Sequence, residues 1–501
     1  MLKKNGSLFV FGCIVFALFL TNAVYAEEGT GSKSYYISPT GNDNNPGTKS
    51  APFKSMMKAQ EVASSGDTVY IRGGVYDEFE IAKTDSNYNY VHAMTKSGIT
   101  YEAYPGERPV FDFKHVPTNL RVAAFYVEDR VTDITFKGFD VVGVKVGNQK
   151  QSEAFRIRGE ANFENMAAHD NEANGFYYTG RGTGIVLNSD AYNNIGPTDI
   201  SAGNTDGFGA HGGPVSFINS RAWNNSDDGF DSISSTGAVV YDHCWAFNNR
   251  GNQNGIGDKN GFKVGGYSYR TSGLPDPLPV HTVRYSLAVN NGANGLYANH
   301  QPGKAADWIN NTAYNNGLSY GANFNMLERV SPTSEEDIPG YREVLHNNIA
   351  YNGTTIINDN HQPENVANNS WTIDGGIKIN TTDFYSLDVS QLSAPRKPDG
   401  GLPDVTFMRP VTTSPLYKYK LGYLADQKDP FLSLRDLVTT FTNDGTIDHV
   451  GIANSLQKKL KNRNLSSFIN QVKAQEGKQI EKEAANILIR EANTWNALIT
   501  K

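Results

Sequence analysis

Cysteine is almost absent from this chain of 501 residues, which contains only Cys13 and Cys244. Cys13 lies in an N-terminal segment that we expect to be removed, so the mature chain would keep a single cysteine. An internal disulfide is then excluded. We predict that Cys244 is a small buried hydrophobic residue rather than a reactive thiol.

Long hydrophobic runs are also scarce. The most apolar run, residues 8–20, follows Lys3 and Lys4 and precedes the sequence VYA at residues 24–26. The run is too short to span a bilayer comfortably, and this order of basic, apolar and small residues is typical of a secretory signal peptide. We therefore predict that residues 1–26 are a signal peptide and that the protein is secreted, with no membrane attachment after cleavage.

Positive charge is not in excess either. The net charge is −7, and loss of Lys3 and Lys4 with the signal would bring it to −9. This excludes the broadly basic surface that nucleic-acid-binding proteins show, so we expect no nucleic-acid partner. An acidic polymer would have to be held locally, through a bound cation or a few lysines and arginines.

The chain is instead rich in glycine and in paired asparagines, which favour turns and short strands. A motif of the form Ala-x-Asn-Asn recurs, with small variations, at residues 168–171, 191–194, 222–225, 246–249, 288–291, 313–316 and 350–353. The shortest spacings are in the low twenties and the others are longer. A base period with insertions is typical of a solenoid whose loops differ in length.

A second motif, Asn or Asp followed by Gly and then Phe or Leu, is interleaved with the first at residues 174–176, 206–208, 228–230, 260–262 and 294–296. The Phe or Leu would point inward and stack, and asparagine side chains can form hydrogen-bonded ladders between rungs. We therefore predict an all-β fold, a right-handed parallel β-helix. A propeller would need a longer and more even period.

The two ends of the chain differ from this repeat. Residues 52–63 have apolar residues near helical spacing and predict a helix that caps the open end of the solenoid, starting at Pro52. Residues 395–423 are rich in proline and predict a return along the outside of the solenoid. We predict a β-helix catalytic domain over residues 27–425 and a small helical appendage over residues 426–501, with helices near residues 432–441, 452–461, 465–475 and 480–499.

The acidic residues gather where the second motif repeats. Aligned on Gly-Phe, Asp206 and Asp228 share one column with Asn260, and Asp231 shares another with Lys263. Equivalent positions in stacked rungs lie about 4.8 Å apart. These columns therefore predict a cluster of carboxylates with one lysine at its edge.

Four carboxylates this close would repel one another unless some were protonated or a cation bound between them. The candidate ligands are Asp206, Asp227, Asp228 and Asp231. With oxygen ligands and neither cysteine nor paired histidine, the cluster favours Ca²⁺ over Zn²⁺. Isolated Asp-Gly turns facing solvent are the alternative interpretation.

Lys263 is either an exposed surface lysine or a base, and a neighbouring divalent cation would lower its pKa toward a usable value.

The export signal, the solenoid and the sequences NTDG (204–207), DDGFD (227–231) and NGFK (260–263) resemble the pectate lyases of polysaccharide lyase family 9. The resemblance covers most of the chain before the helical tail. It implies Ca²⁺ bound by Asp206, Asp227, Asp228 and Asp231, and Lys263 as the catalytic base. The implied activity is calcium-assisted β-elimination of α-1,4-polygalacturonate, an acidic plant cell-wall polysaccharide, by a monomeric enzyme. We name six further candidates for substrate binding: Arg250, Lys259, Arg270, Tyr267, Tyr297 and His300.

Three alternatives remain open at this point. A β-helix polygalacturonase would also use NTDG, Asp227-Asp228 and a following His211, but hydrolysis needs only two carboxylates and gives Lys263 no role. A rhamnogalacturonan lyase of the same fold would deprotonate the same type of sugar. A non-catalytic solenoid would bind pectin without turnover.

Overall fold

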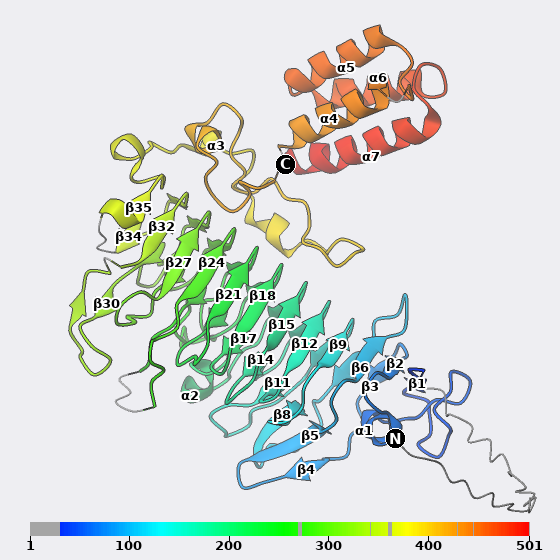
Figure 1. Ribbon diagram of the computed structural model, residues 1–501, viewed down its shortest axis with the longest axis vertical. Helices are drawn as coiled ribbons and strands as arrows, with labels where there is room; N and C mark the ends of the chain where they lie inside the picture. The colour runs from blue at the N-terminus through cyan, green and yellow to red at the C-terminus, as the bar shows by residue number, and fades with distance from the viewer. Residues whose placement is uncertain are drawn as a thin grey trace, which may run out of the picture.

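The computed structural model describes residues 31–268, 273–340, 342–358, 363–427, 429–443 and 445–499. Through most of this length the chain winds into a parallel β-helix, whose rungs stack in chain order from the blue end to the yellow end of Figure 1. Each full turn contributes one strand to each of three long sheets. The predicted fold class is therefore confirmed for the part of the chain that the structure describes.

The first sheet has twelve parallel strands. They are β1 (Ser34–Ile37), β2 (Thr68–Ile71), β6 (Thr100–Ala103), β9 (Ile134–Lys137), β12 (Ala161–Glu164), β15 (Gly184–Leu187), β18 (Val215–Ile218), β21 (Val239–Asp242), β24 (His281–Arg284), β27 (Ala306–Ile309), β32 (Val344–His346) and β35 (Val366–Ala367). The free thiol of Cys244 lies in the interior just after β21, where burial raises its pKa to about 12. This confirms the prediction that it is a buried hydrophobic residue.

The second sheet has ten strands and carries the Ala-x-Asn-Asn motif. Its strands are β3 (Val75–Tyr76), β7 (Val110–Asp112), β10 (Asp140–Val142), β13 (Ala167–His169), β16 (Asp190–Tyr192), β19 (Arg221–Trp223), β22 (Trp245–Phe247), β25 (Leu287–Val289), β28 (Thr312–Tyr314) and β33 (Ile349–Tyr351). The seven alanines of the motif are register partners from rung to rung: Ala168, Ala191, Ala222, Ala246, Ala288, Ala313 and Ala350. The repeat therefore marks one position of each turn.

The third sheet has eleven strands and carries the second motif. Its strands are β4 (Lys83–Thr84), β5 (Tyr88–Met94), β8 (Arg121–Val127), β11 (Glu153–Ile157), β14 (Asn174–Tyr178), β17 (Phe208–Ala210), β20 (Phe230–Asp231), β23 (Phe262–Lys263), β26 (Leu296–Tyr297), β29 (Phe324–Asn325) and β34 (Ile357–Asn358). The phenylalanines of the motif point into the core and stack, and the ring centroids of Phe208 and Phe230 are 4.9 Å apart. A separate antiparallel pair, β30 (Glu328–Arg329) and β31 (Asp337–Ile338), lies beside the sheet.

An asparagine ladder joins the second sheet to the third. From Asn171 to Asn316, the second asparagine of one motif donates from its side-chain amide to the amide oxygen of the second asparagine of the next, as Asn225 does to Asn249 at 3.1 Å and Asn249 to Asn291 at 3.0 Å. The first asparagine, for example Asn248, has a positive φ of 57°. Asparagine tolerates this left-handed conformation better than most residues, so the motif supplies both the turn and the ladder.

We expect Asn249→Ala to destabilise the protein by about 3 kcal/mol, because it leaves buried donors of Asn225 without an acceptor. Thermal unfolding compared with the exposed Lys150→Ala variant measures the effect. Unfolding of both variants at the wild-type temperature would show that the ladder contributes nothing to stability.

The N-terminal cap is a helix, α1 (Met56–Val62). Its predicted start at Pro52 is wrong, because Phe53 still bridges to Ile37 and the Ser55 hydroxyl accepts from the Lys58 amide at 3.1 Å and so begins the helix. Met56 is buried in the interior of the solenoid. The helix therefore covers the open end, as predicted.

The chain after β35 folds against the outside of the second sheet. This segment includes η1 (Pro363–Asn365), η2 (Ile373–Gly375), η3 (Thr381–Asp383), η4 (Val389–Ser393) and α3 (Pro415–Lys418). Phe407 and Tyr423 pack there with Trp245 and Leu287. The return along the solenoid's outside, predicted for residues 395–423, is confirmed by this packing.

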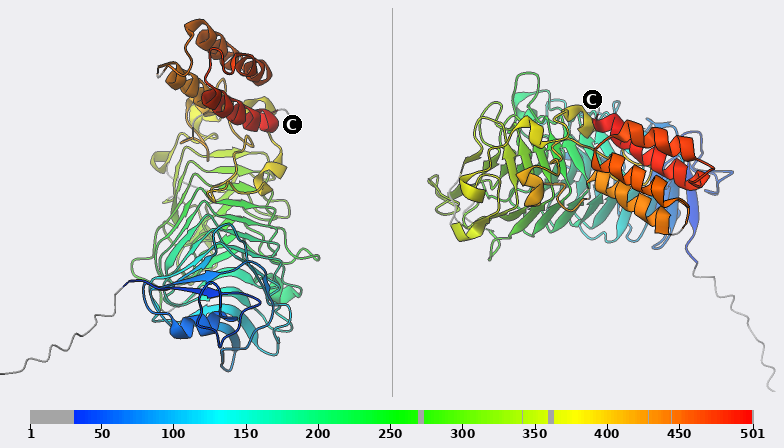
Figure 2. Two further views of the ribbon diagram at one scale, coloured as in Figure 1. Left: turned by 90° about the vertical axis from the view of Figure 1, so that its right-hand side faces the viewer. Right: turned by 90° about the horizontal axis from the view of Figure 1, so that it is seen from above.

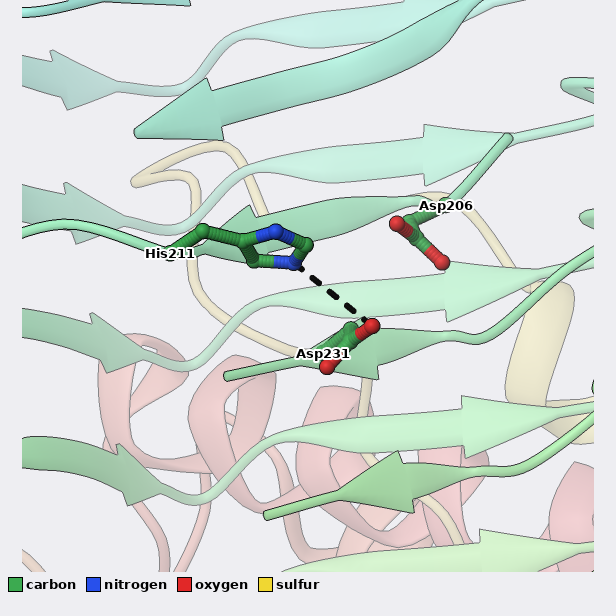
Figure 3. A group of neighbouring side chains, drawn as sticks. All are labelled: Asp206, His211 and Asp231. Carbon is green, nitrogen blue, oxygen red and sulfur yellow. Dashed lines mark ion pairs between the residues drawn. The ribbon is translucent and has the colours of Figure 1, made fainter. Parts of the chain in front are cut away.

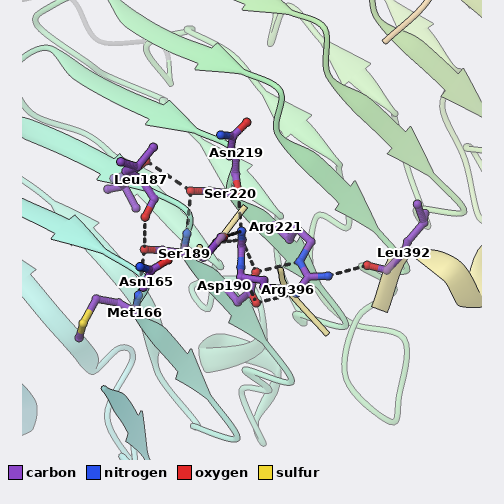
Figure 4. Close-up of polar contacts among 12 residues, drawn as sticks. Asn165, Met166, Leu187, Ser189, Asp190, Asn219, Ser220, Arg221, Leu392 and Arg396 are labelled. Carbon is purple, nitrogen blue, oxygen red and sulfur yellow. Dashed lines mark hydrogen bonds and ion pairs between the residues drawn. The ribbon is translucent and has the colours of Figure 1, made fainter. Parts of the chain in front are cut away.

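An ion cluster fastens this returning segment (Figure 4). The Arg396 guanidinium donates to both carboxylate oxygens of Asp190, at 2.6 and 3.1 Å, and Arg221 pairs with the same carboxylate at 2.7 Å. Arg221 also donates to the backbone oxygen of Leu392 at 2.9 Å. The buried carboxylate thus holds two segments that are far apart in the sequence.

The tail forms a bundle of four helices, α4 (Pro430–Asn443), α5 (Val450–Lys461), α6 (Leu465–Gln475) and α7 (Lys482–Ile499), drawn in orange and red in Figure 2. Its apolar stripes pack into a core of their own, which confirms four helices near the predicted ranges. The domain boundary at residue 425 stays a prediction. Among the described residues, the helices are all too short or too polar to cross a membrane.

Candidate active site

The strand register of the third sheet brings the residues of the candidate site together. Asp231 on β20 pairs with Gly209 on β17 and with Lys263 on β23, and Lys263 pairs in turn with Tyr297 on β26. Phe230 and Phe262 beside them point inward, so alternation turns Asp231 and Lys263 to the outer face of the sheet. The column predicted from the sequence is therefore present.

Asp206 and Asp228 lie just before β17 and β20, at a position where the neighbouring rungs carry asparagine. The side chains at this position of successive rungs form a second ladder. In it, one oxygen of each carboxylate takes the place of an amide oxygen. Asp206 Oδ1 accepts from the Asp228 backbone amide at 3.1 Å, and Asp228 Oδ1 accepts from the backbone and side-chain amides of Asn260 at 2.7 and 2.8 Å. The other oxygen of Asp228, Oδ2, lies on the side of Lys263.

The two remaining acids are fixed by backbone amides. Asp227 Oδ1 accepts from the Asp258 amide at 2.6 Å, and Asp231 Oδ1 accepts from the Ile233 amide at 2.7 Å. None of the four acids is more than 4% exposed. Buried carboxylates without matching positive charge are costly, so this density of acids requires compensation.

Lys263 supplies part of that compensation. Its ammonium lies 3.2 Å from Asp228 Oδ2 and 3.4 Å from Asp231 Oδ2, and it donates a hydrogen bond to Asp258 Oδ2 at 2.7 Å. Asp228 Oδ2 is buried and accepts no hydrogen bond from the described residues. Lys263 itself is only 8% exposed, which rules out the interpretation as an exposed surface lysine.

The pKa values reflect this crowding. Burial and repulsion by neighbouring carboxylates raise the pKa of Asp206 and of Asp227 well above the ordinary value, and burial raises the pKa of Asp228 to about 7. Burial acts the same way on Asp231, but Lys263 and then His211 outweigh it and lower its pKa to about 2. One lysine therefore does not neutralise the cluster.

His211 completes the cluster on the side away from Lys263. In Figure 3 its imidazole points toward Asp206 and Asp231, and its Nε2 lies 3.5 Å from Asp231 Oδ2. Nε2 is buried and makes no hydrogen bond with the described residues. Its ring also packs edge-on against Tyr177, with centroids 4.9 Å apart.

The donor set fits a hard divalent cation. Asp206, Asp227 and Asp228 each offer a carboxylate oxygen, and the three oxygens lie within 4.8 Å of one another. Asp206, His211 and Asp231 offer a second group of ligand atoms at the same mutual spacing. Clustered carboxylate oxygens are the ligands that calcium prefers, and Asp228 Oδ2, which pairs with Lys263 but accepts no hydrogen bond from the described residues, is the kind of atom that such an ion satisfies.

A cavity of about 240 Å³ opens next to Lys263. Lys263, Tyr267, Tyr297 and His300 line it together with Asp258 and Arg329. Tyr267 is buried and donates from its hydroxyl to the Ser235 backbone oxygen at 3.0 Å. Three of the six substrate-binding candidates thus lie beside Lys263.

The structure does not bring Arg250 or Lys259 into this cavity. Arg250 donates to the backbone oxygen of Asn290 at 3.0 Å, on the asparagine turns. The Lys259 ammonium donates to the Gly255 backbone oxygen at 3.0 Å and lies over the Tyr320 ring. Arg270 lies outside the described residues.

Sequence reasoning missed three neighbours of the site. Asp258 lies five positions before Lys263 and pairs with it, although its side chain is 55% exposed. His211 follows the NTDG sequence and was considered only for hydrolysis. Arg329 comes from β30, outside both repeats, so no periodic signal marked it.

Comparisons with known proteins show the family of this chain. A family described as the Pel9A-like right-handed β-helix region matches residues 35–348. Pectate lyase L of Dickeya chrysanthemi is 32% identical over 396 residues, which span 76% of this chain and 84% of that protein. Pectate lyase PEL9 of Emericella nidulans is 26% identical over 407 residues, 75% of this chain and 92% of that protein.

Solved structures give the same family. A rhamnogalacturonan lyase has a TM-score of 0.70 and 36% identity and covers 78% of this chain and all of its own. The pectate lyase Pel9A has a TM-score of 0.61 and 30% identity, over 77% of this chain and 91% of its own. This chain therefore belongs to the Pel9A-like right-handed β-helices of polysaccharide lyase family 9.

Proposed function

We propose that this protein is a calcium-dependent pectate lyase that cleaves α-1,4-linked polygalacturonate by β-elimination. The observation that supports it most strongly is the contact of a buried lysine amine with the carboxylates of Asp228 and Asp231, at 3.2 and 3.4 Å. A base and a cluster able to hold a cation are thus adjacent, on the outer face of a sheet that a sugar chain can follow.

The chemistry begins at C5 of a galacturonate residue, where the proton is α to the carboxylate. In the proposal the unprotonated Lys263 amine takes that proton. The electrons of the C5–H bond form the C4–C5 double bond, and the glycosidic oxygen on C4 leaves with the electrons of its bond. The product is a new chain end with an unsaturated sugar.

Asp206, Asp227, Asp228 and Asp231 would hold Ca²⁺ beside this base. When bound, the ion supplies positive charge next to the sugar carboxylate, which stabilises the negative charge that develops as the C5 proton departs. The four acids are held by backbone amides and by the ladder, so they need little reorganisation to bind it.

A hydrolase uses these groups less well. Hydrolysis needs one carboxylic acid and one carboxylate on opposite sides of the cleaved bond. Here Asp228 and Asp231 both contact the single ammonium of Lys263. A hydrolytic mechanism gives that lysine no catalytic role. The β-elimination reaction uses both the acids and the lysine.

Rhamnogalacturonan backbone is the second candidate substrate. It also contains galacturonate with a C5 proton, and the rhamnogalacturonan lyase structure is 36% identical to this chain. The same base and cation would serve both substrates, so the choice between them rests on groups that contact the neighbouring sugars.

The experiment is a product assay on polygalacturonate and on rhamnogalacturonan, with and without a calcium chelator. We expect ultraviolet absorbance from an unsaturated product on polygalacturonate, lost on chelation and restored by added calcium. Saturated sugars released despite the chelator would favour the hydrolase. Absorbance on rhamnogalacturonan alone would favour the second candidate, and binding without turnover a carbohydrate-binding solenoid.

The rate is expected to rise into alkaline pH, because the base must be unprotonated. Burial lowers the pKa of Lys263, but the carboxylates of Asp231 and Asp228 outweigh it and raise the pKa well above its ordinary value. Bound calcium cancels part of that negative potential, so more calcium should move the alkaline rise to lower pH. Rate profiles at low and high calcium test this, and profiles with the same midpoint would contradict it.

Secretion is part of the same proposal, since the substrate is a plant cell-wall polymer. The predicted signal peptide at residues 1–26 lies outside the described residues. The monomeric state and the separate helical appendage also stay predictions.

A further inference from the structure

We infer that Arg156 binds a carboxylate of the sugar chain several residues away from the cleaved bond. This inference deepens the proposed function and rests on it. It adds to the site an arginine that the sequence motifs did not mark.

The register of the third sheet places Arg156 in the same outward column as the base. Arg156 on β11 pairs with Tyr177 on β14, which pairs with Gly209 on β17. Gly209 pairs with Asp231, and Asp231 with Lys263. Four strand steps thus separate the arginine from the lysine, roughly 19 Å at about 4.8 Å per step. A chain lying along this face would meet both.

Gly209 makes room between them for the ring of Tyr177. A Cβ built at this position would lie 2.8 Å from Cδ2 of Tyr177 and 3.5 Å from Nε2 of His211. Any larger residue would therefore displace the tyrosine ring. The Tyr177 ring, which also packs edge-on against His211, therefore lines the column between Arg156 and Asp231.

The guanidinium of Arg156 is held in place before any ligand arrives. It lies over the ring of Tyr88, 4.5 Å from the centroid, and donates from Nη1 to Glu153 Oε1 at 3.2 Å. Glu153 is itself fixed by the Tyr88 hydroxyl, which donates to the same oxygen at 3.0 Å. An immobilised arginine loses little side-chain entropy when it binds, which favours affinity.

One edge of this guanidinium is left for a ligand. Within the described residues, the guanidinium of Arg156 donates one hydrogen bond, to Glu153. Its Nε is buried and has no hydrogen-bond partner among them. The side chain keeps 14% of its surface exposed. The exposed part of the guanidinium can donate a charge-assisted hydrogen bond to a carboxylate oxygen, and galacturonate carries one carboxylate on every sugar.

The test compares Arg156→Gln with wild type on long polygalacturonate and on trigalacturonate, by steady-state kinetics. Arg158→Gln is the matched control, because Arg158 is two residues along the chain and is already paired with Asp129 at 2.7 Å. A trimer centred on Lys263 is too short to reach Arg156. We expect Arg156→Gln to raise KM for the polymer about tenfold, since a charged hydrogen-bonded pair is lost, with kcat within about twofold and KM for the trimer unchanged.

Arg156→Lys should recover part of the affinity, because it restores the charge but not the planar guanidinium. An unchanged KM for the polymer would overturn the inference. Equal losses on polymer and trimer, with a lower melting temperature than Arg158→Gln, would also overturn it by showing that Arg156 only supports the fold. Wild-type enzyme that yields no unsaturated product would instead refute the proposed function.

Discussion

Replacing Lys263 with alanine is expected to lower turnover of polygalacturonate by about 10²-fold to 10⁴-fold, the contribution typical of a positioned general base. The Lys263 amine lies 3.2 Å from Asp228 Oδ2 and 3.4 Å from Asp231 Oδ2, beside the proposed calcium ligands. The loss should fall on kcat, because the amine acts on the C5 proton and not on substrate binding. Initial rates of unsaturated product formation at saturating calcium measure it.

Two controls accompany this variant. Calcium binding followed by calorimetry should persist in Lys263→Ala, because the four acids remain and lose a competing ammonium. Lys137→Ala, in which a lysine of the first sheet loses an ion pair with Glu164, should keep wild-type rates. Turnover by Lys263→Ala close to that of wild type would show that another group is the base.

Replacing Asp228 with asparagine is expected to weaken calcium binding by about 100-fold, because the number of charged ligands sets calcium affinity. Asparagine keeps an oxygen that can accept from Asn260, as Asp228 Oδ1 does at 2.7 Å. The fold should therefore survive while the negative charge that Oδ2 presents to the cluster and to Lys263 is lost. Calorimetric titration with calcium, together with turnover as a function of calcium, measures the change.

The calcium dependence separates this variant from the lysine variant. Turnover by Asp228→Asn should recover in part at high calcium, whereas turnover by Lys263→Ala should not. Asp199→Asn is the matched control, since it removes one exposed acid from the short helix α2 (Asp199–Ala202) just before Asp206. Equal calcium affinity in Asp228→Asn and wild type would exclude Asp228 as a ligand.

The periodic parts of the structure could be predicted from the sequence. In a solenoid each rung repeats the same contacts, so the inward stack of Phe208 and Phe230 and the ladder of Asn225 and Asn249 recur as motifs. Aligning the motifs therefore aligned the strands, and it placed Lys263 beside Asp231. The column of the site followed from the register of the core.

The parts outside the repeat could not be predicted in this way. Arg329 reaches the cavity from β30, and Arg396 reaches Asp190 from more than 200 positions away. Such contacts depend on how loops of unequal length fold back, and no period encodes that. The pKa of Lys263 was expected to be lowered beside a cation. The protein groups alone raise it, because its carboxylate neighbours are closer and more numerous than the motif indicated.

A crystal structure of the calcium-soaked protein tests the central claim most directly. The account predicts one or more calcium ions bound by the carboxylates of Asp206, Asp227, Asp228 and Asp231, with the Lys263 amine beside them and open to the cavity. Calcium bound elsewhere, with these four carboxylates and Lys263 paired only to one another, would contradict it.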